Sequence, residues 1–145
     1  MTEKNYDALK LENQLCFPLY ACAREVMKLY KPVLDEIDLT YTQYITMMVL
    51  WEEPCVTSKR IGERLHLDSG TLTPVLKKLA ERGLVTRCRS AEDERNLTVT
   101  LTEAGLALRE RAADVPARMG ACVRLEPEEA GLLHRLLYKL LDGTE

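Results

Sequence analysis

The sequence feature that most constrains the fold is a turn between two short helix-forming stretches, followed by two strand-like stretches. Leu67-Asp68-Ser69-Gly70 carries residues that favour turns and helix caps, and Gly83 stands where a C-terminal glycine cap belongs. A helix-turn-helix followed by a two-stranded hairpin predicts a winged helix. The expected elements are a first helix after the cap Thr57, a second helix from about 71 to 82, strands at 84–89 and 96–101, and a polar hairpin tip at 90–95.

A long amphipathic helix is expected before this unit. Apolar side chains recur every three or four residues over about 7–30. Pro18 either begins this helix or bends it, because proline donates no amide hydrogen. Lys31-Pro32 marks a break or a restart, and a further helix, capped by Thr42, is expected over about 42–52.

Two more helices are expected after the hairpin, one over about 102–115, ended by Pro116, and one over 127–141. The last carries more leucines than so small a domain can hide, so the simplest burial is against a second copy of the chain. The predicted fold class is mainly α with a small β-hairpin. We expect one domain of 145 residues, with the winged helix-turn-helix at about 42–102 and dimerisation helices at about 7–38 and 103–141.

Charge favours nucleic acid only in the middle of the chain. The net charge is −3, but residues 57–95 hold nine Lys and Arg against six Asp and Glu, a local net charge of +3. A phosphate-binding surface would have to lie there. The longest stretch without a charge, 39–51, is too short and too polar to cross a bilayer. Because the first residues also lack the apolar core of a signal peptide, we expect a cytoplasmic protein with no membrane partner.

The second helix of the helix-turn-helix is the expected reader of double-stranded DNA. Placed in a major groove, it would present its N-terminal side chains to base edges, while nearby cations would meet phosphates. The backbone amides around Ser69 and Gly70 could also receive a phosphate. Arg95 at the hairpin tip suits a narrow minor groove. The expected base-reading residues are Ser69, Thr71, Thr73, Pro74 and Lys77, and the expected phosphate contacts are Lys78, Arg82, Arg87 and Arg89.

The cysteines form no familiar metal or disulfide pattern. Positions 16, 22, 55, 88 and 122 include no Cys-x-x-Cys pair, and His66 and His134 stand far apart. We therefore expect neither a metal nor a cofactor. Since the ordinary role of a cytosolic cysteine is that of a small buried apolar residue, Cys22 is expected in the core. Cys55 is expected in a loop and Cys88 on a wing strand.

The hairpin and the helix after it carry a recognisable motif. Residues 93–105, Asp-Glu-Arg-Asn-Leu-Thr-Val-Thr-Leu-Thr-Glu-Ala-Gly, resemble the wing signature of the MarR family of dimeric winged-helix regulators. In that signature Asp93 and Arg95 precede the second wing strand and a Leu-Thr-x-x-Gly helix start, so both join the expected DNA-binding residues. Further segments are similar to the OhrR branch of organic-hydroperoxide-sensing repressors, and the resemblance runs from 11 to about 116. Those segments are 11–17, 30–32, 40–44, 50–52 and 67–74.

The resemblance implies that Cys16 is the peroxide-reactive thiol. Its thiolate would attack a peroxide oxygen, become a sulfenic acid and expel an alcohol. The resemblance also implies that the hydroxyls of Tyr20, Tyr30 and Tyr41 stabilise the thiolate, the last two from the other subunit. Apolar surroundings would favour an alkyl or lipid hydroperoxide. Cys122 lies in about the place of a resolving cysteine that closes an intersubunit disulfide, and the alternative is that a small thiol caps Cys16.

The predicted function is that of a homodimeric repressor that binds a pseudo-palindromic operator and releases it when an organic hydroperoxide, its inducer, oxidises Cys16. The alternative is a MarR-type regulator that responds to a small lipophilic or phenolic ligand in the dimer pocket. Among enzymes, a thiol peroxidase would use the same thiol chemistry. The sequence lacks the thioredoxin-like order of strands and helices that such an enzyme needs, so we do not expect an enzyme.

Overall fold

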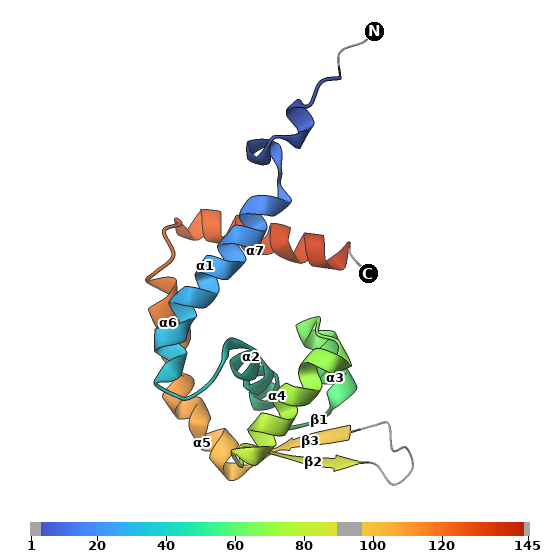
Figure 1. Cartoon of the computed structure of the whole chain (residues 1–145). Coiled ribbons are helices and arrows are strands. Elements are labelled where there is room, and N and C mark those ends of the chain that lie inside the picture. The colour runs from blue at the N-terminus through green and yellow to red at the C-terminus, as the bar shows by residue number, and fades with distance from the viewer. Residues whose placement is uncertain (1–3, 90–96, 144–145) are drawn as a thin grey trace. The chain divides into compact units, whose positions relative to one another are not determined.

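The computed structural model describes residues 4–89 and 97–143. The chain forms two compact units, Met1–Val115 and Pro116–Glu145, each described by itself below. A mainly helical first unit with a small sheet confirms the predicted fold class, whereas the division into one winged domain and dimerisation helices stays a prediction. The first unit contains α1 (Cys16–Asp35), α2 (Tyr41–Glu52), β1 (Cys55–Thr57), α3 (Ser58–Leu65), α4 (Ser69–Glu81), β2 (Val85–Arg89), β3 (Leu97–Leu101) and α5 (Glu103–Ala112), as Figure 1 shows.

Helices α3 and α4 form the predicted helix-turn-helix. The side chains of Thr57 and Asp68 each accept a backbone amide from the first turn of the helix that follows, so both helices have polar N-caps. Between them the chain turns through His66, whose φ is 53°. Gly83 takes a φ of 73° after α4, which confirms its role as a C-terminal cap. The second helix begins at Ser69 rather than at about 71, because Asp68 is the residue that caps it.

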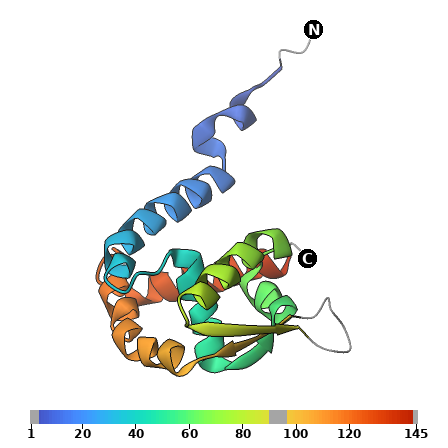
Figure 2. The same ribbon diagram turned by 60° about the horizontal axis from the view of Figure 1, so that its bottom comes forward.

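The sheet has three strands in the order β1-β3-β2, all antiparallel. Val56 and Arg87 lie on either side of Val99, which is fully buried. Helices α2, α3 and α4 lie on one side of this sheet in Figure 1, and the turned view in Figure 2 shows α4 beside β2. The prediction that Cys55 lies in a loop is wrong, since it pairs with Thr100 in β1. A strand of three residues has no periodicity of its own and forms through its partner. The expected hairpin tip, with Asp93 and Arg95, lies outside the described residues.

Helix α2 runs through the middle of the first unit. Its cap is Thr40 rather than Thr42, because Thr40 and Gln43 exchange the two hydrogen bonds of a capping box. Trp51 at its other end donates its indole N–H to the carbonyl of Gly105, at 2.9 Å, and so ties α2 to α5. The core that α2 helps to form consists of Leu34, Ile37, Leu39, Tyr44, Met47, Val49, Leu50, Val56, Ile61, Leu72, Leu76, Leu79, Leu84, Val85, Val99 and Leu108.

Helix α1 differs from the prediction at both ends. The expected helix over 7–30 begins at Cys16, after 3-10 turns at Asp7–Leu9 and Leu11–Asn13. Of the two alternatives for Pro18, the helix starts beside it: Pro18 is in the first turn, where no amide partner is missing. The expected break at Lys31-Pro32 is wrong. Pro32 lies inside α1, three residues before its last residue, and its missing amide removes one helical hydrogen bond.

The break expected at Pro116 is also displaced. Helix α5 ends at Ala112, and α6 (Val115–Gly120) starts before the proline, which falls in its first turn. In the second unit, α7 (Pro127–Asp142) begins with a capping box between Glu126 and Glu129. This range confirms the predicted last helix. Its exposed leucines are Leu132, Leu133, Leu136, Leu140 and Leu141. No helix within the described residues is long and apolar enough to cross a membrane.

Candidate nucleic-acid interface and cysteine site

Helix α4 has one buried face and one open face. Leu72, Leu76 and Leu79 are buried against the rest of the unit, at 2% exposure or less. The predicted DNA-reading side chains lie on the other side and are all exposed, and the Thr73 hydroxyl donates to the carbonyl of Ser69 at 2.7 Å. The exposed DNA-reading candidates on α4 are Ser69, Thr71, Thr73, Pro74, Lys77 and Lys78.

The first turn of α4 already holds a negative charge. Asp68 Oδ1 accepts the Thr71 amide at 2.7 Å, and this hydrogen bond lowers the pKa of the Asp68 carboxyl below its usual value. A phosphate at this turn, as expected from the amides near Ser69 and Gly70, would therefore meet a carboxylate. Binding of a phosphate at this turn stays a prediction.

The cations predicted to meet phosphates separate into two groups. Lys78 on α4 and both Arg87 and Arg89 on β2 are exposed. Arg82 behaves differently, because its Nη1 donates to the backbone carbonyl of Asp38, in the loop between α1 and α2. Nothing in the sequence pointed to that contact.

Cys16 is the first residue of α1 and is exposed. Tyr20 follows one helical turn later, so both side chains lie on the same face of the helix. The guanidinium of Arg24 lies 5.6 Å from the centre of the Tyr20 ring. Cys16 thus lies in the first turn of α1, with a phenol one helical turn away on the same face.

Two of the predicted tyrosines meet elsewhere in the same unit. The rings of Tyr30 on α1 and Tyr41 on α2 have centres 4.8 Å apart, and Tyr44 lies 6.1 Å from Tyr30. Burial raises the pKa values of Tyr30 and Tyr44 above that of a free phenol, so these hydroxyls stay protonated across the neutral range. A protonated phenol can donate a hydrogen bond to a thiolate.

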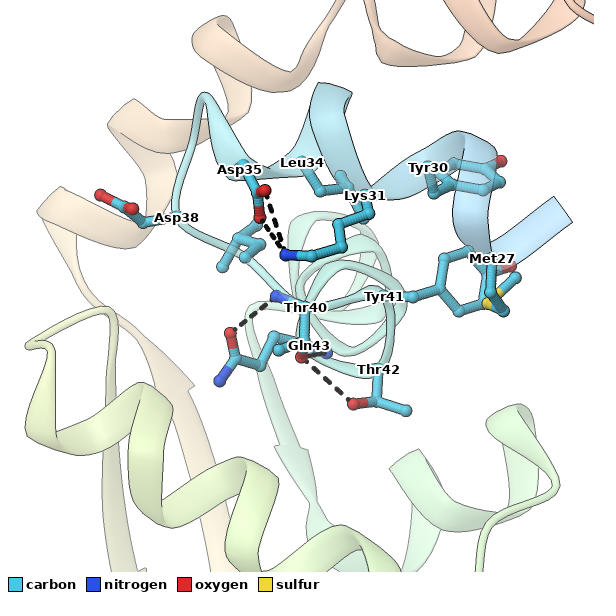
Figure 3. Close-up of a pocket in the computed structure, with 11 residues that line it drawn as sticks. Met27, Tyr30, Lys31, Leu34, Asp35, Asp38, Thr40, Tyr41, Thr42 and Gln43 are labelled. Carbon is cyan, nitrogen blue, oxygen red and sulfur yellow. Dashed lines mark hydrogen bonds and ion pairs between the residues drawn. The ribbon is translucent and has the colours of Figure 1, made fainter. Parts of the chain in front are cut away.

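A pocket of about 560 Å³ lies beside this pair. In Figure 3 the rings of Tyr30 and Tyr41 lie next to Met27, and the ion pair of Lys31 with Asp35, at 3.1 Å, lies at another part of the wall. Its volume falls in the range of small-molecule sites. The residues that line it are Met27, Tyr30, Lys31, Leu34, Asp35, Asp38, Leu39, Thr40, Tyr41, Thr42 and Gln43.

Cys16 cannot reach this pocket within one chain. Cys16 and Tyr30 are fourteen residues apart on α1, which at about 1.5 Å per residue separates them by roughly 20 Å along the axis. The structure therefore groups Cys16 with Tyr20, and Tyr30 with Tyr41. Joining the two groups requires the helix of a second copy.

The remaining cysteines are free and exposed in the chain, so the expectation that Cys22 is a core residue is wrong. Most of the first half of α1 around it is likewise exposed in the single chain. Cys88 lies on β2, as predicted. Cys122 belongs to the second unit, where its Sγ contacts the carbonyl of Arg118 at 3.5 Å, and its resolving role stays a prediction.

The order of α3, α4 and the β2–β3 hairpin, with an exposed helix face for reading DNA, defines a winged helix-turn-helix regulator. The family model for the transcriptional regulator SarA/Rot matches residues 28–111. An organic hydroperoxide resistance transcriptional regulator of Bacillus subtilis is 49% identical over 140 residues, which cover 97% of this chain and 95% of that protein. The chain therefore belongs to the MarR family of winged-helix transcriptional regulators, in the group that includes organic hydroperoxide regulators.

Other relatives agree with this placement. The regulator SarZ of Staphylococcus aureus is 45% identical over 109 residues, covering 75% of this chain and 74% of SarZ. Among solved structures, that of reduced AbfR bound to DNA superposes with a TM-score of 0.77 at 34% identity, over 96% of this chain and 98% of the other. AbfR is a protein of Staphylococcus epidermidis whose overoxidised form has also been solved on DNA, and whose disulfide form is known.

Proposed function

We propose that this protein is a homodimeric repressor that binds an operator in double-stranded DNA and releases it when an organic hydroperoxide oxidises Cys16. The observation that carries the proposal is the division of the site. Cys16 and Tyr20 lie at the start of α1, while Tyr30 and Tyr41 flank a pocket near its end. A two-fold dimer in which α1 helices run against each other would bring each cysteine to the pocket of the other chain.

The relatives support both halves of this proposal. The relative at 49% identity is named for resistance to organic hydroperoxides, which supports an organic hydroperoxide as the inducer. The structure of AbfR bound to DNA supports DNA as the partner. The dimer is supported by the exposed apolar side chains of α1 and α7, which the single chain leaves uncovered, and we assign dimerisation to the helices at about 7–38 and 103–141.

The sensing step is a two-electron oxidation of one sulfur. The Cys16 thiolate attacks the terminal peroxide oxygen, so the S–O bond forms as the O–O bond breaks. The alkoxide takes a proton and leaves as an alcohol, and a sulfenic acid remains on Cys16. Because the product stays on the protein, we propose a sensor that uses one hydroperoxide per thiol and not an enzyme. We propose that this sensor acts in the cytoplasm, where the DNA and the reducing thiols are.

For DNA reading we retain all the candidates except Arg82, which donates to the carbonyl of Asp38. We propose that the N-terminal side of α4 contacts base edges and that cations on α4 and β2 contact phosphates. Arg95 in the wing is proposed to enter the minor groove, and Asp93 is kept as a DNA-binding residue on the family signature alone. The base-contacting residues are Ser69, Thr71, Thr73, Pro74 and Lys77, and the phosphate-contacting residues are Lys78, Arg87 and Arg89.

The experiment compares DNA affinity before and after oxidation. A fluorescent duplex is first selected from a random-sequence pool with the reduced protein, and anisotropy then gives the affinity with and without cumene hydroperoxide. The proposal expects release after oxidation and recovery with dithiothreitol. Equal affinities of the reduced and oxidised protein would refute it.

One observation favours the second candidate, a regulator of small lipophilic or phenolic ligands. The pocket at Tyr30 and Tyr41 is large enough to hold such a ligand. In that case an apolar phenol would release the duplex from fully reduced protein, and hydroperoxide would have no effect.

Replacing either pocket tyrosine should slow oxidation without abolishing it. Tyr30→Phe and Tyr41→Phe each remove one hydroxyl that is proposed to donate to the Cys16 thiolate, a contribution of about 1 to 1.5 kcal/mol, or roughly a 5- to 13-fold loss of rate. The measurement is the rate of Cys16 oxidation by cumene hydroperoxide. Tyr6→Phe is the matched control, since Tyr6 is 63% exposed and lies far from the pocket in the sequence. Wild-type rates for both pocket variants would contradict the proposed role.

Cys122→Ser distinguishes two ways of ending the oxidation. If Cys122 resolves the sulfenic acid, the variant should lose the oxidant-induced covalent dimer on a non-reducing gel and should overoxidise more readily. Cys55→Ser removes another exposed thiol and should keep that dimer. If wild-type protein forms no covalent dimer and instead accumulates mixed disulfides with added small thiols, Cys122 is not the resolving residue.

A further inference from the structure

The loop between α1 and α2 is closed by a compact set of backbone hydrogen bonds. The amide of Leu39 donates to the carbonyl of Leu34 and that of Asp38 to the carbonyl of Asp35, at 3.1 and 3.2 Å. Asp38 takes a φ of 54°, and both leucines are buried. This is the Schellman arrangement, in which an aspartate holds the left-handed position that glycine usually occupies. These hydrogen bonds therefore give the loop a defined backbone conformation.

Two arginines from other elements donate hydrogen bonds to backbone carbonyls of this loop. Arg82, the C-cap residue of α4, donates Nη1 to the carbonyl of Asp38. Arg111, near the end of α5, donates Nη2 to the carbonyl of Glu36 at 2.7 Å. Both acceptors are carbonyls at the end of a helix, where a cation is favoured. The loop is thus fastened to the DNA-reading helix on one side and to α5 on the other.

The same loop forms part of the pocket. Asp38 and Leu39 line it, followed by Thr40 and Tyr41 at the start of α2. Figure 3 shows Asp38 in the short connection that leads from Asp35 at the end of α1 to Thr40. The segment 36–39 therefore both borders the pocket and has a backbone carbonyl bound directly to α4.

We propose that Arg82 and Arg111 are positioning residues that transmit the state of the pocket to the recognition helix through the 36–39 loop. This rests on the proposed hydroperoxide response, because without that response there is no change to transmit. It assigns Arg82 to the loop carbonyl in place of a DNA phosphate. Removing either arginine should leave the oxidation chemistry intact and weaken its effect on DNA binding.

The test measures the ratio of DNA affinities of reduced and oxidised protein on the selected duplex, together with the rate of Cys16 oxidation. Arg111→Gln and Arg82→Gln should each lower that ratio, by roughly 2- to 30-fold, as is typical for residues on a coupling route. Arg111→Lys keeps a charged donor and should restore most of the ratio. Arg109→Gln is the matched control: it removes the same charge from an exposed position two residues away, on another face of α5.

The outcomes separate the possible failures. Wild-type oxidation rates with a lowered ratio in the Gln variants, and a wild-type ratio in Arg109→Gln, support the inference. If both Arg82→Gln and Arg111→Gln have the wild-type ratio of affinities, the inference is overturned while the proposed function stands. If wild-type protein keeps its DNA after oxidation, the inference and the proposed function are both overturned. For Arg82→Gln, a slope of log affinity against log salt that becomes shallower by about one identifies a phosphate contact and overturns the assignment of Arg82. Thermal unfolding checks that each variant is folded, and Arg82→Lys replaces Arg82→Gln if that variant is not.

Discussion

Cys16→Ser protein is expected to bind the selected duplex like wild type and to keep it after addition of cumene hydroperoxide. A serine hydroxyl has no accessible anion at neutral pH and cannot form a sulfenic acid, so the proposed sensing step is lost altogether. DNA affinity should be retained, because Cys16 lies at the start of α1 and the recognition helix begins at Ser69. Anisotropy of the labelled duplex, followed over time after hydroperoxide addition, measures the effect.

Cys22→Ser is the matched control for this variant. Cys22 is also an exposed cysteine of α1, six residues further along. Cys22→Ser protein should therefore release the duplex after addition of hydroperoxide, like wild type. If Cys16→Ser released DNA at the wild-type rate, the sensing mechanism would be wrong while the winged-helix fold would stand. If Cys22→Ser lost the response instead, the reactive thiol would have been misassigned.

Gly105→Ala is expected to lower the free energy of unfolding by about 2 to 4 kcal/mol. A Cβ at this position would lie 2.2 Å from the carbonyl oxygen of Leu84 and 2.6 Å from Leu101 Cδ1. The Leu84 oxygen belongs to the backbone and cannot rotate out of the way as a side chain can. Helix α5 would therefore have to move away from the base of the wing. The same movement would pull the Gly105 carbonyl from the indole N–H of Trp51. Denaturant unfolding measures the loss.

Gly70→Ala provides the comparison. There the new Cβ would meet its nearest atom, Asp68 Oδ1, at 3.5 Å, an ordinary contact, and the position lies in helix α4. Alanine should be neutral there or stabilise by up to about 1 kcal/mol. Equal stability of Gly105→Ala and wild-type protein would contradict the close approach of α5 to the wing.

The elements that could be predicted from the sequence are those with local causes. Thr57 and Gly83 mark their helix ends by their own chemistry, and the alternation at 97–101 is that of a strand with one buried face. The same is true of the exposed face of α4, which follows from the spacing of its leucines. The cysteine and tyrosine candidates came from family motifs, and the structure adds how they are distributed along α1.

The features that could not be predicted depend on contacts between distant residues. Strand β1 exists because it pairs with β3, and Pro32 stays inside α1 because burial of Leu34 holds the last turn in place. The position of Arg82 beside a DNA-reading helix predicts a phosphate contact, and nothing local to it in the sequence predicts its hydrogen bond to a loop carbonyl. Its carbonyl partner is forty-four residues away in the sequence, in a loop whose shape depends on the left-handed conformation of Asp38.

A single titration can follow both the oxidation of Cys16 and the release of DNA. Wild-type protein on the selected duplex is given substoichiometric steps of cumene hydroperoxide, and each sample is divided between anisotropy and peptide mass spectrometry of Cys16. We expect the fraction of DNA released to rise in step with the fraction of Cys16 that is oxidised. Release of DNA while Cys16 remains a thiol, or full oxidation of Cys16 with the DNA still bound, would contradict it.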